Sequence, residues 1–491
     1  MIYHFHITSA AFSLPFPKTR ALGRSHTRRV TKYSLSSSLL FIYHGENETS
    51  TMSKVHASDN NGCSEGVVDV ELLKDERGGL MWEEGITTIT YYTASTENAF
   101  VQASEALQAQ FALVAESNPW ILGRLVKVKG KGVCLQHPAK PSSKDIEPVF
   151  RTIEDNSLPK MASFSTSSSA SYIDICKELC SKKGKAAAVG SGYSLVGKSD
   201  RPVSLLTLTK CGGDSFALVF SMSHAIGDGR TYYEIYKMLE PGAAVRKLEP
   251  SRMQTFSESM RDMCGRKELE WADKASTQIM YTVAMLPMML GCGKAPKCYA
   301  FRLDSERIAS AKSKEVAASS GAVSYVSTND IITSAFFNVC KARIGMMGLD
   351  CRERVDGVKA DMAGNYVTAL VLDPEVFGTP VALRSMYSKV PYETAKMRLP
   401  GACACCCGNT NFAMTTNWSS FGSVINLPDA TVSVHLPVKN PAYCLFDLMI
   451  PFVTGADGGE IGVLCWTVST DEEGLRSALP VGESVSNALF P

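Results

Sequence analysis

A ten-residue segment, Phe220–Gly229, constrains this chain more than any other part of its sequence. The apolar run Phe216–Phe220 predicts a buried strand, and Thr231–Leu239 has apolar residues three and four apart, which predicts a helix. Two glycines between these segments predict a tight turn. The chain must therefore fold here as strand, turn and helix, with His224 at the end of the strand and Asp228 just before the helix.

A histidine in this position is suited to general-base chemistry. The usual pKa of an imidazole lies near neutrality, so a small environmental shift allows His224 to exchange protons at cellular pH. The alternative is a hydrogen-bonded core histidine, because the spacing His-x-x-x-Asp alone is common. Asp228 lies in another direction at this spacing, and we expect it to be structural, paired with an arginine that holds the turn. We expect Gly229 to be part of the turn itself.

The overall composition excludes several classes of protein. With 491 residues the chain is expected to form two or more domains. Its 50 basic and 49 acidic residues leave no basic excess, which argues against a nucleic-acid partner. The longest apolar stretch, Met280–Leu290, is too short to cross a membrane and contains a proline. We therefore expect a soluble monomer without a transmembrane segment.

The cysteine pattern indicates reduced thiols. Sixteen cysteines in 491 residues are far fewer than a disulfide scaffold has, and Cys340 and Cys465 stand in apolar surroundings. Cys403 and Cys406 form a C-x-x-C pair without a second such pair, whereas a structural zinc site needs about four ligands. The sequence predicts no metal site and a reducing compartment.

The first 45 residues differ from the rest of the chain. They contain six lysines and arginines, no acidic residue, and many serines and threonines. Such a composition is typical of an organelle transit peptide, or of a leader ahead of a true start at Met52. We expect a cytoplasmic protein, or a plastid or other organelle protein if the segment is a transit peptide. Neither alternative makes this segment part of the fold.

The remaining chain alternates between strand-like and helix-like patterns in both halves, which predicts an α/β class with two comparable lobes. We expect a leader at 1–65, an N-terminal lobe at 66–245, a crossover at 246–297 and a C-terminal lobe at 298–491. The first half is expected to contain strands at 85–92, 203–209 and 216–220, a helix at 97–116, and a hairpin from 120–126 and 132–136. The crossover is expected to contain a helix around 257–275. The second half is expected to contain strands at 298–303, 367–372, 412–418, 431–436 and 461–468, a helix at 304–318, and a helix capped by Ser327 or Thr328.

The segment His224–Gly229 resembles the H-x-x-x-D-G motif of the CoA-dependent acyltransferase superfamily. This superfamily includes plant-type BAHD acyltransferases, chloramphenicol acetyltransferase-like enzymes, wax ester synthases and condensation domains of non-ribosomal peptide synthesis. Further segments resemble family features in the same order along the chain. They are Asn118–Leu125, Ser327–Ile332, Arg352–Tyr366 with its Gly-Asn pair, Thr415–Phe421, and Ile450-Pro451 followed by Asp457–Val463.

The resemblance implies a two-lobed chloramphenicol acetyltransferase-like fold with an active-site tunnel between the lobes. It implies that His224 is a general base in direct acyl transfer from a coenzyme A thioester to a small-molecule alcohol or amine, without a covalent acyl-enzyme. Coenzyme A is then a co-substrate, and no bound cofactor is expected. Asn417, Ser419 and Ser420 are the candidate polar contacts at the oxyanion. Lys294, Lys297 and Arg302 are the candidate contacts to the coenzyme A phosphates.

Two departures leave the subfamily open. The plant-type D-F-G-W-G element is absent where the chain has Leu427–Val432, and Ser223 occupies the first histidine position of the H-H-x-x-x-D-G motif found in condensation domains and wax ester synthases. A wax-synthase-like or condensation-like transfer from a long-chain or carrier-bound donor therefore stays an alternative. So does a non-catalytic binding protein that retains the fold. The sequence does not predict the acyl group or the acceptor.

Overall fold

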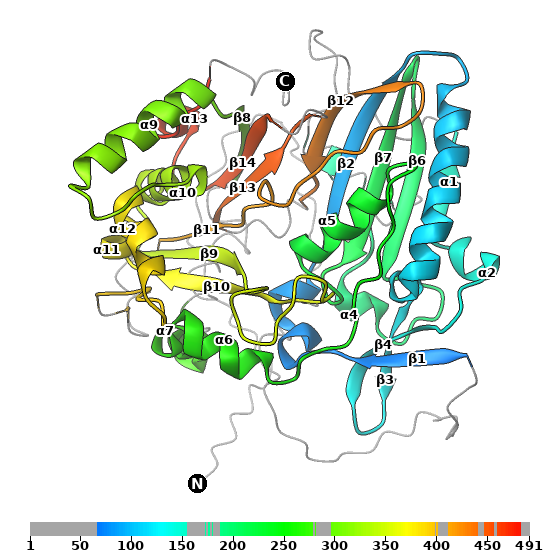
Figure 1. The fold of residues 1–491 in the computed structure, drawn as a ribbon, viewed down its shortest axis with the longest axis horizontal. Coiled ribbons are helices and arrows are strands. Elements are labelled where there is room, and N and C mark those ends of the chain that lie inside the picture. The colour runs from blue at the N-terminus through cyan, green and yellow to red at the C-terminus, as the bar shows by residue number, and fades with distance from the viewer. Residues whose placement is uncertain are drawn as a thin grey trace, which may run out of the picture. The chain divides into compact units, whose positions relative to one another are not determined.

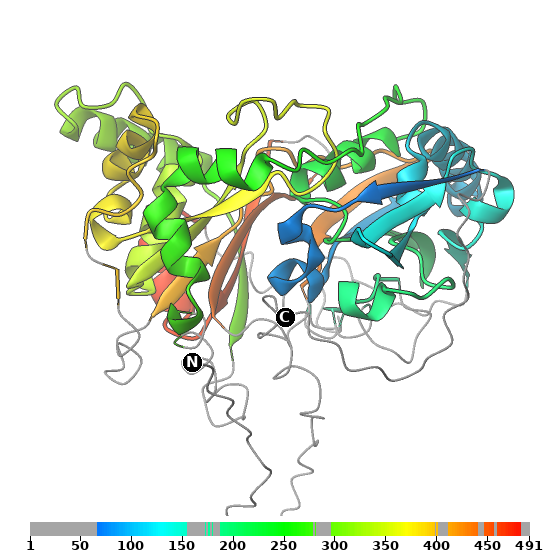
Figure 2. The same cartoon turned by 90° about the horizontal axis from the view of Figure 1, so that it is seen from below.

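The computed structural model describes residues 66–154, 187–277, 296–397, 411–439, 446–455 and 459–482, together with residues 172, 175, 176, 179, 280, 399 and 400. Several residues singled out in the sequence lie outside this part: the leader at 1–65, most of the apolar stretch 280–290, Lys294, and the cysteines from 403 to 407. Figures 1 and 2 show the described chain from two directions.

A five-stranded sheet forms the core of the first half. In order across the sheet its strands are β12 (Ala430–Pro437), β2 (Gly85–Ala94), β7 (Ser215–Ser223), β6 (Ser204–Gly212) and β5 (Phe150–Ile153). The helices α1 (Ala99–Ser117) and α5 (Gly229–Met238) pack their apolar residues against it (Figure 1). Every residue of β7 after its first is buried, because this central strand is covered on both faces. The predicted strands, the helix at 97–116 and the helix after the motif are confirmed.

A six-stranded sheet forms the second core. Its strands, in order, are β10 (Val367–Leu372), β9 (Ile344–Asp350), β11 (Phe412–Thr415), β13 (Asp447–Val453), β14 (Ile461–Thr467) and β8 (Lys297–Arg302). The helices that pack on it are α6 (Phe256–Cys264), α7 (Arg266–Asp273), α9 (Ser305–Ala318), α10 (Thr328–Val339), α11 (Pro374–Phe377), α12 (Pro380–Ser385) and α13 (Glu472–Ala478). Ser327 caps α10 in a capping box with Asp330, as its spacing predicts.

A small third sheet lies beside the first. It consists of β1 (Val67–Glu71), β4 (Gly132–Pro138) and β3 (Arg124–Val128). Short helices complete the described part: α2 (Ser143–Ile146), α4 (Gly192–Leu195), and the 3-10 helices η1 (Lys74–Arg77), η2 (Gly79–Trp82), η3 (Pro119–Leu122) and η4 (Met386–Ser388). The helix η1 follows directly after β1, and it contributes to the site described below.

The two larger sheets are joined by a strand exchanged between the halves. β12 comes from the second half of the sequence but pairs with β2 in the first sheet, from Ala430 opposite Ala94 to Pro437 opposite Thr88. A common apolar cluster with members from β2, β7, β12, β13 and β14 fills the space between the sheets, which lie side by side in Figures 1 and 2. The pairing of β12 with β2 therefore ties the second half of the chain to the first sheet.

Three expected elements differ from the structure. The helix expected around 257–275 is two helices, because Gly265 has φ +93° and ends α6 in the left-handed region that favours glycine. The first strand of the expected hairpin begins only at Arg124, because Pro119 starts the 3-10 helix η3. The strand expected at 412–418 ends at Thr415.

Candidate active site

The turn between β7 and α5 is built as its sequence predicts. β7 ends at Ser223, His224 follows it directly, and α5 begins at Gly229. Asp228 is the N-cap of α5, and its Oδ1 accepts the backbone N–H of Thr231 at 2.9 Å. This bond satisfies one of the helix's free N–H groups, so Asp228 anchors the end of the turn that carries His224.

Asp228 also holds a distant loop against the turn. Its Oδ2 accepts from Arg352 Nη1 at 2.8 Å and from the backbone N–H of Tyr366 at 3.0 Å. Arg352 Nη2 donates in turn to Thr231 Oγ1 and to the carbonyl of Gly364, each at 2.9 Å. Both side chains of this ion pair are buried. The arginine expected as the partner of Asp228 is therefore Arg352.

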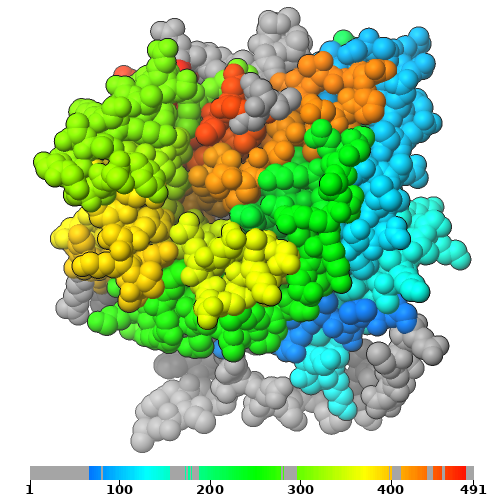
Figure 3. All heavy atoms as spheres, viewed as in Figure 1, coloured from blue at the N-terminus to red at the C-terminus, as the bar shows by residue number. Residues whose placement is uncertain are grey.

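The loop that carries Arg352 covers the turn from one side. In the space-filling view the loop residues, drawn in yellow, lie against α5, drawn in green, and the surface is hollowed between them and the orange residues 411–439 (Figure 3). His224 itself is only partly buried. The loop thus fixes the turn without sealing the histidine from solvent.

Asn365, on the same loop, determines which nitrogen of His224 carries the proton. Its Nδ2 donates to the carbonyl of His224 at 2.8 Å and to Glu76 Oε1 at 3.1 Å, so its Oδ1 must face the imidazole. That Oδ1 lies 3.0 Å from His224 Nδ1, which therefore carries the hydrogen. Nε2 keeps its lone pair and has no hydrogen-bond partner among the residues that the structure describes. A neutral imidazole in this tautomer is a proton acceptor at Nε2.

The surroundings of His224 favour its neutral form. Burial lowers the pKa of His224 below its ordinary value, and the nearby ammonium of Lys439 lowers it further, while Asp228 and the hydrogen bond to Asn365 act in the opposite direction. Lys439 forms an ion pair with Glu84, which precedes β2. Since the first residue of β2 pairs with Ser223, this ion pair lies next to His224 across the sheet.

The charge of Lys439 gives a test of this environment. Only neutral His224 can accept a proton, so activity that depends on it is lost as the pH falls through its pKa, which burial lowers from its ordinary value. Replacing Lys439→Gln removes a positive charge that lowers this pKa. The acid limb of kcat/KM should therefore move to higher pH. Lys314→Gln removes the same charge from an exposed position on α9 and serves as the control. An acid limb at the same pH in both variants would contradict the interpretation.

The predicted oxyanion contacts lie after β11. Asn417 Oδ1 accepts from the backbone N–H of Ser419 at 2.9 Å and from its hydroxyl at 2.7 Å. The same N–H also lies 3.1 Å from the carbonyl of Pro451. Both donors of Ser419 are thus used within the turn, whereas Ser420 is exposed. The role of these three residues at a reaction centre stays a prediction.

The segment after Asn417 reaches the motif at Gly229. A Cβ atom at Gly229 would lie 3.0 Å from Cζ of Phe421 and 3.9 Å from Cδ1 of Trp418. The aromatic rings leave almost no room for a side chain at this position, which gives a steric reason for glycine at the start of α5. The structure therefore brings the two segments together, although they are almost 200 positions apart in the sequence.

The predicted coenzyme A contacts lie elsewhere. Lys297 and Arg302 are the two ends of β8, at one edge of the six-stranded sheet, and Arg302 pairs with Glu460 at 3.3 Å. Asn365 precedes β10, at the opposite edge of that sheet. At a strand spacing of ~4.8 Å the two edges are about 24 Å apart. The structure does not place these basic residues beside Asn365, and their role stays a prediction.

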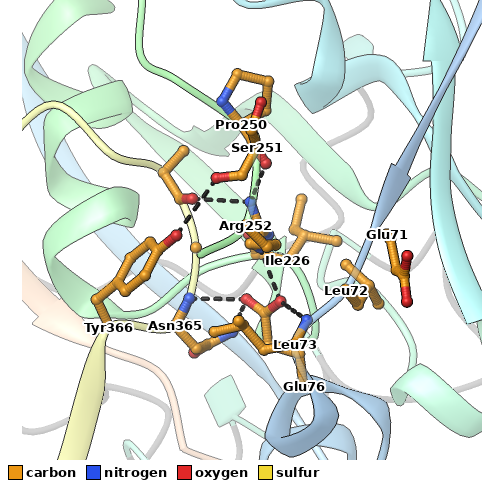
Figure 4. Close-up of polar contacts among 12 residues, drawn as sticks. Glu71, Leu72, Leu73, Glu76, Ile226, Pro250, Ser251, Arg252, Asn365 and Tyr366 are labelled. Carbon is orange, nitrogen blue, oxygen red and sulfur yellow. Dashed lines mark hydrogen bonds and ion pairs between the residues drawn. The ribbon is translucent and has the colours of Figure 1, made fainter. Parts of the chain in front are cut away.

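Two further residues of the site carry no recognisable signal in the sequence. Glu76 and Arg252 form an ion pair at 2.8 Å with both side chains fully buried, and Glu76 contacts Asn365 (Figure 4). Glu76 lies in a charged stretch followed by two glycines, which is typical of a surface turn, and Arg252 lies in the expected crossover. Neither residue lies in a segment that resembles a family feature, whereas their neighbour Asn365 does, in the Gly-Asn pair at 364–365.

The described residues contain neither a candidate metal cluster nor a membrane-spanning helix. No group of three or more histidine, cysteine, aspartate or glutamate residues in these ranges could hold a metal ion. In the same ranges, none of the helices combines the length and the apolar character that crossing a membrane requires.

Comparison with known proteins identifies the fold. No protein-family model matches the sequence, and no curated protein matches it significantly. The crystal structure of F. sporotrichioides TRI101 complexed with coenzyme A and T-2 matches with a TM-score of 0.53 and 13% identity, over 84% of this chain and 96% of that chain. Polyketide synthase associated protein 5 from Mycobacterium tuberculosis matches with a TM-score of 0.48 and 13% identity, over 85% of this chain and 99% of that chain. The first condensation domain of the CDA synthetase matches with a TM-score of 0.45 and 13% identity, over 84% of this chain and 93% of that chain. The likeness to TRI101 confirms the predicted fold: the chain has a two-lobed, chloramphenicol acetyltransferase-like α/β fold.

Proposed function

We propose that the protein is an acyltransferase that moves an acyl group from a coenzyme A thioester to a hydroxyl or amine acceptor. The observation that carries this proposal is the state of His224, whose Nδ1–H is held by Asn365 while Nε2 keeps an available lone pair. The shared fold supports it, since TRI101 was crystallised with coenzyme A and the small molecule T-2. Both the donor and the acceptor are therefore expected to be small molecules.

The proposed reaction needs no covalent intermediate on the protein. His224 Nε2 takes the proton of the acceptor O–H or N–H while the acceptor atom attacks the thioester carbonyl carbon. The resulting tetrahedral intermediate carries its negative charge on the former carbonyl oxygen. When this intermediate collapses, the C–S bond breaks and the imidazolium returns the proton to the departing sulfur. The products are the acylated acceptor and free coenzyme A.

Other residues have supporting roles in the proposal. Asp228 and Gly229 shape the turn that presents His224. The Nδ2 of Asn417 and the hydroxyl of Ser420 are the donors that we assign to the oxyanion, since the two donors of Ser419 already bond within the turn or to Pro451. Losing one such donor in an enzyme costs about 3–4 kcal/mol of transition-state stabilisation.

A coenzyme A release assay tests the proposal. Purified protein is mixed with acyl-CoA donors of short and long chain and with panels of alcohols and amines, and free thiol is measured over time. We expect thiol release that requires both a donor and an acceptor. Release only from long-chain acyl-CoA would favour the wax-synthase-like alternative, and release only from carrier-bound donors, added as a third donor class, would favour the condensation-like one. Binding of acyl-CoA without release, across the whole panel, would favour a non-catalytic binding protein.

A further inference from the structure

A buried carboxylate stands behind Asn365 and is saturated with hydrogen bonds. Glu76 Oε1 accepts from the backbone N–H of Asn365 at 2.7 Å and from its Nδ2 at 3.1 Å. Glu76 Oε2 accepts from the backbone N–H of Leu73 at 2.9 Å and from Arg252 Nε at 2.8 Å. Figure 4 shows Glu76 between these two sets of donors. Each hydrogen bond to the carboxylate from the described residues comes from an N–H donor.

Arg252 connects the same carboxylate to the segment that carries His224 and to the loop that carries Asn365. Its Nη2 donates to the carbonyl of Ile226 at 2.8 Å, and its Nη1 donates to the carbonyl of Ala363 at 2.8 Å. Ile226 lies two residues after His224, and Ala363 lies two residues before Asn365. The ion pair therefore holds the chain on each side of the His224–Asn365 hydrogen bond.

The backbone next to Asn365 is shaped around this guanidinium. Gly364 has φ +137°, a conformation that side chains rarely adopt. A Cβ atom built there would lie 2.8 Å from both Nε and Cζ of Arg252. The glycine thus allows the loop to approach the guanidinium closely, which places Asn365 within reach of both Glu76 and His224.

An ion pair is a costly way to stabilise a core. Two fully buried charges must be removed from water, and well-packed apolar residues often stabilise such a site equally well. What an apolar pair cannot supply is the directional set of hydrogen bonds that reaches Asn365, Ile226 and Ala363. The position of the pair, directly behind the partner of His224, indicates a role in orientation.

We propose that Glu76 is a positioning residue: through Asn365 it holds the imidazole of His224 with Nδ1 protonated and Nε2 directed to the substrate. Arg252 completes the arrangement by neutralising Glu76 and by holding Ile226 and Ala363. The functional part of this inference rests on the proposed role of His224 as general base. The structural part, which concerns the tautomer and orientation of His224, does not depend on any reaction.

The variant Glu76→Gln tests the inference with little change in shape. A glutamine has one oxygen that accepts and one NH₂ group that donates, whereas both sides of Glu76 present only donors. In either orientation an NH₂ group therefore faces another donor, and Arg252 loses its negative partner. We expect kcat to fall roughly 10–100-fold, with KM for both substrates within about twofold, because the reacting groups are misplaced while the substrate contacts remain.

The tautomer is measured directly on the ring nitrogens. Nitrogen-15 NMR of histidine-labelled protein distinguishes Nδ1–H from Nε2–H, and the His224 signals are assigned by their absence from the His224→Ala spectrum. We expect the wild type to show only the tautomer with Nδ1 protonated. We expect Glu76→Gln to show a mixture of the Nδ1–H and Nε2–H tautomers. Asp373→Asn is the matched control, because Asp373 is a buried carboxylate that also accepts backbone N–H groups, but at the far end of β10. It should leave kcat and the His224 signals unchanged.

A double variant separates positioning from stability. Glu76→Gln combined with Arg252→Met removes both charges, so no unpaired charge is buried and the fold should regain stability relative to Glu76→Gln alone. If Glu76 acts by positioning, kcat stays low in the double variant. Full recovery of kcat, or unchanged His224 signals in Glu76→Gln, would overturn the inference. Full activity of His224→Ala would instead refute the proposed function, and the tautomer measurement would still decide the structural part.

Discussion

Replacing His224 with alanine is expected to lower kcat/KM for acyl transfer by about 10²–10⁴-fold, the range that general acid–base catalysis contributes. The turn after β7 presents His224, whose Nε2 carries the lone pair that accepts the proton. Alanine has no proton acceptor at this position. The measurement is the rate of coenzyme A release for a donor and acceptor pair on which the wild type is active.

The fold should survive this replacement. His224 is only partly buried, and the described hydrogen bond of its ring is the one to Asn365, whose amide stays bonded to Glu76. The melting temperature should therefore change little. His137→Gln is a suitable control, because His137 lies on β4 and bonds through Nδ1 to the carbonyl of Pro138. Turnover above a tenth of the wild-type rate in His224→Ala would refute a general-base role.

Asp228→Ala is expected to lower the free energy of unfolding by about 3–5 kcal/mol, the typical cost of removing one partner of a buried ion pair. The aspartate accepts hydrogen bonds from Arg352, from Tyr366 and from the first turn of α5. Alanine leaves all three donors without this acceptor and leaves the buried guanidinium with Asp350 as its remaining carboxylate partner. Activity should fall as well, because the turn that carries His224 loses its anchor.

Asparagine at position 228 separates the contribution of the helix cap from that of the buried ion pair. Asn caps helices about as well as Asp, so Asp228→Asn should retain the cap of α5. It loses the charge, and its NH₂ group faces the donors of Arg352 and Tyr366, so the loss of stability in this variant reports on those two hydrogen bonds. Glu154→Ala removes an exposed partner of Lys210 and should change stability by no more than about 0.5 kcal/mol. Chemical denaturation measures all three. An equal cost for Asp228→Ala and Glu154→Ala would contradict the structure.

Local patterns in the sequence were sufficient for the turn and for most of the elements. Periodicity and capping are properties of neighbouring residues, so the strand before His224, the helix after Asp228 and the cap at Ser327 could be predicted. The pairing of Asp228 with an arginine was also expected from its position in the turn, and the structure identifies that arginine as Arg352. The break at Gly265 was missed, since a glycine inside a helical pattern does not by itself show that φ is positive.

The sequence by itself determined the kind of fold and the residue most suited to proton transfer, whereas the tertiary structure decided what surrounds that residue. The contact between His224 and Asn365 spans 141 positions, and the contact between Glu76 and Asn365 spans 289. The exchange of β12 into the first sheet is equally long-range. Such contacts leave no periodic pattern, and a charged residue that will be buried looks the same in a sequence as one that stays in water. Only folding, which brings the donors around each carboxylate, distinguishes the two.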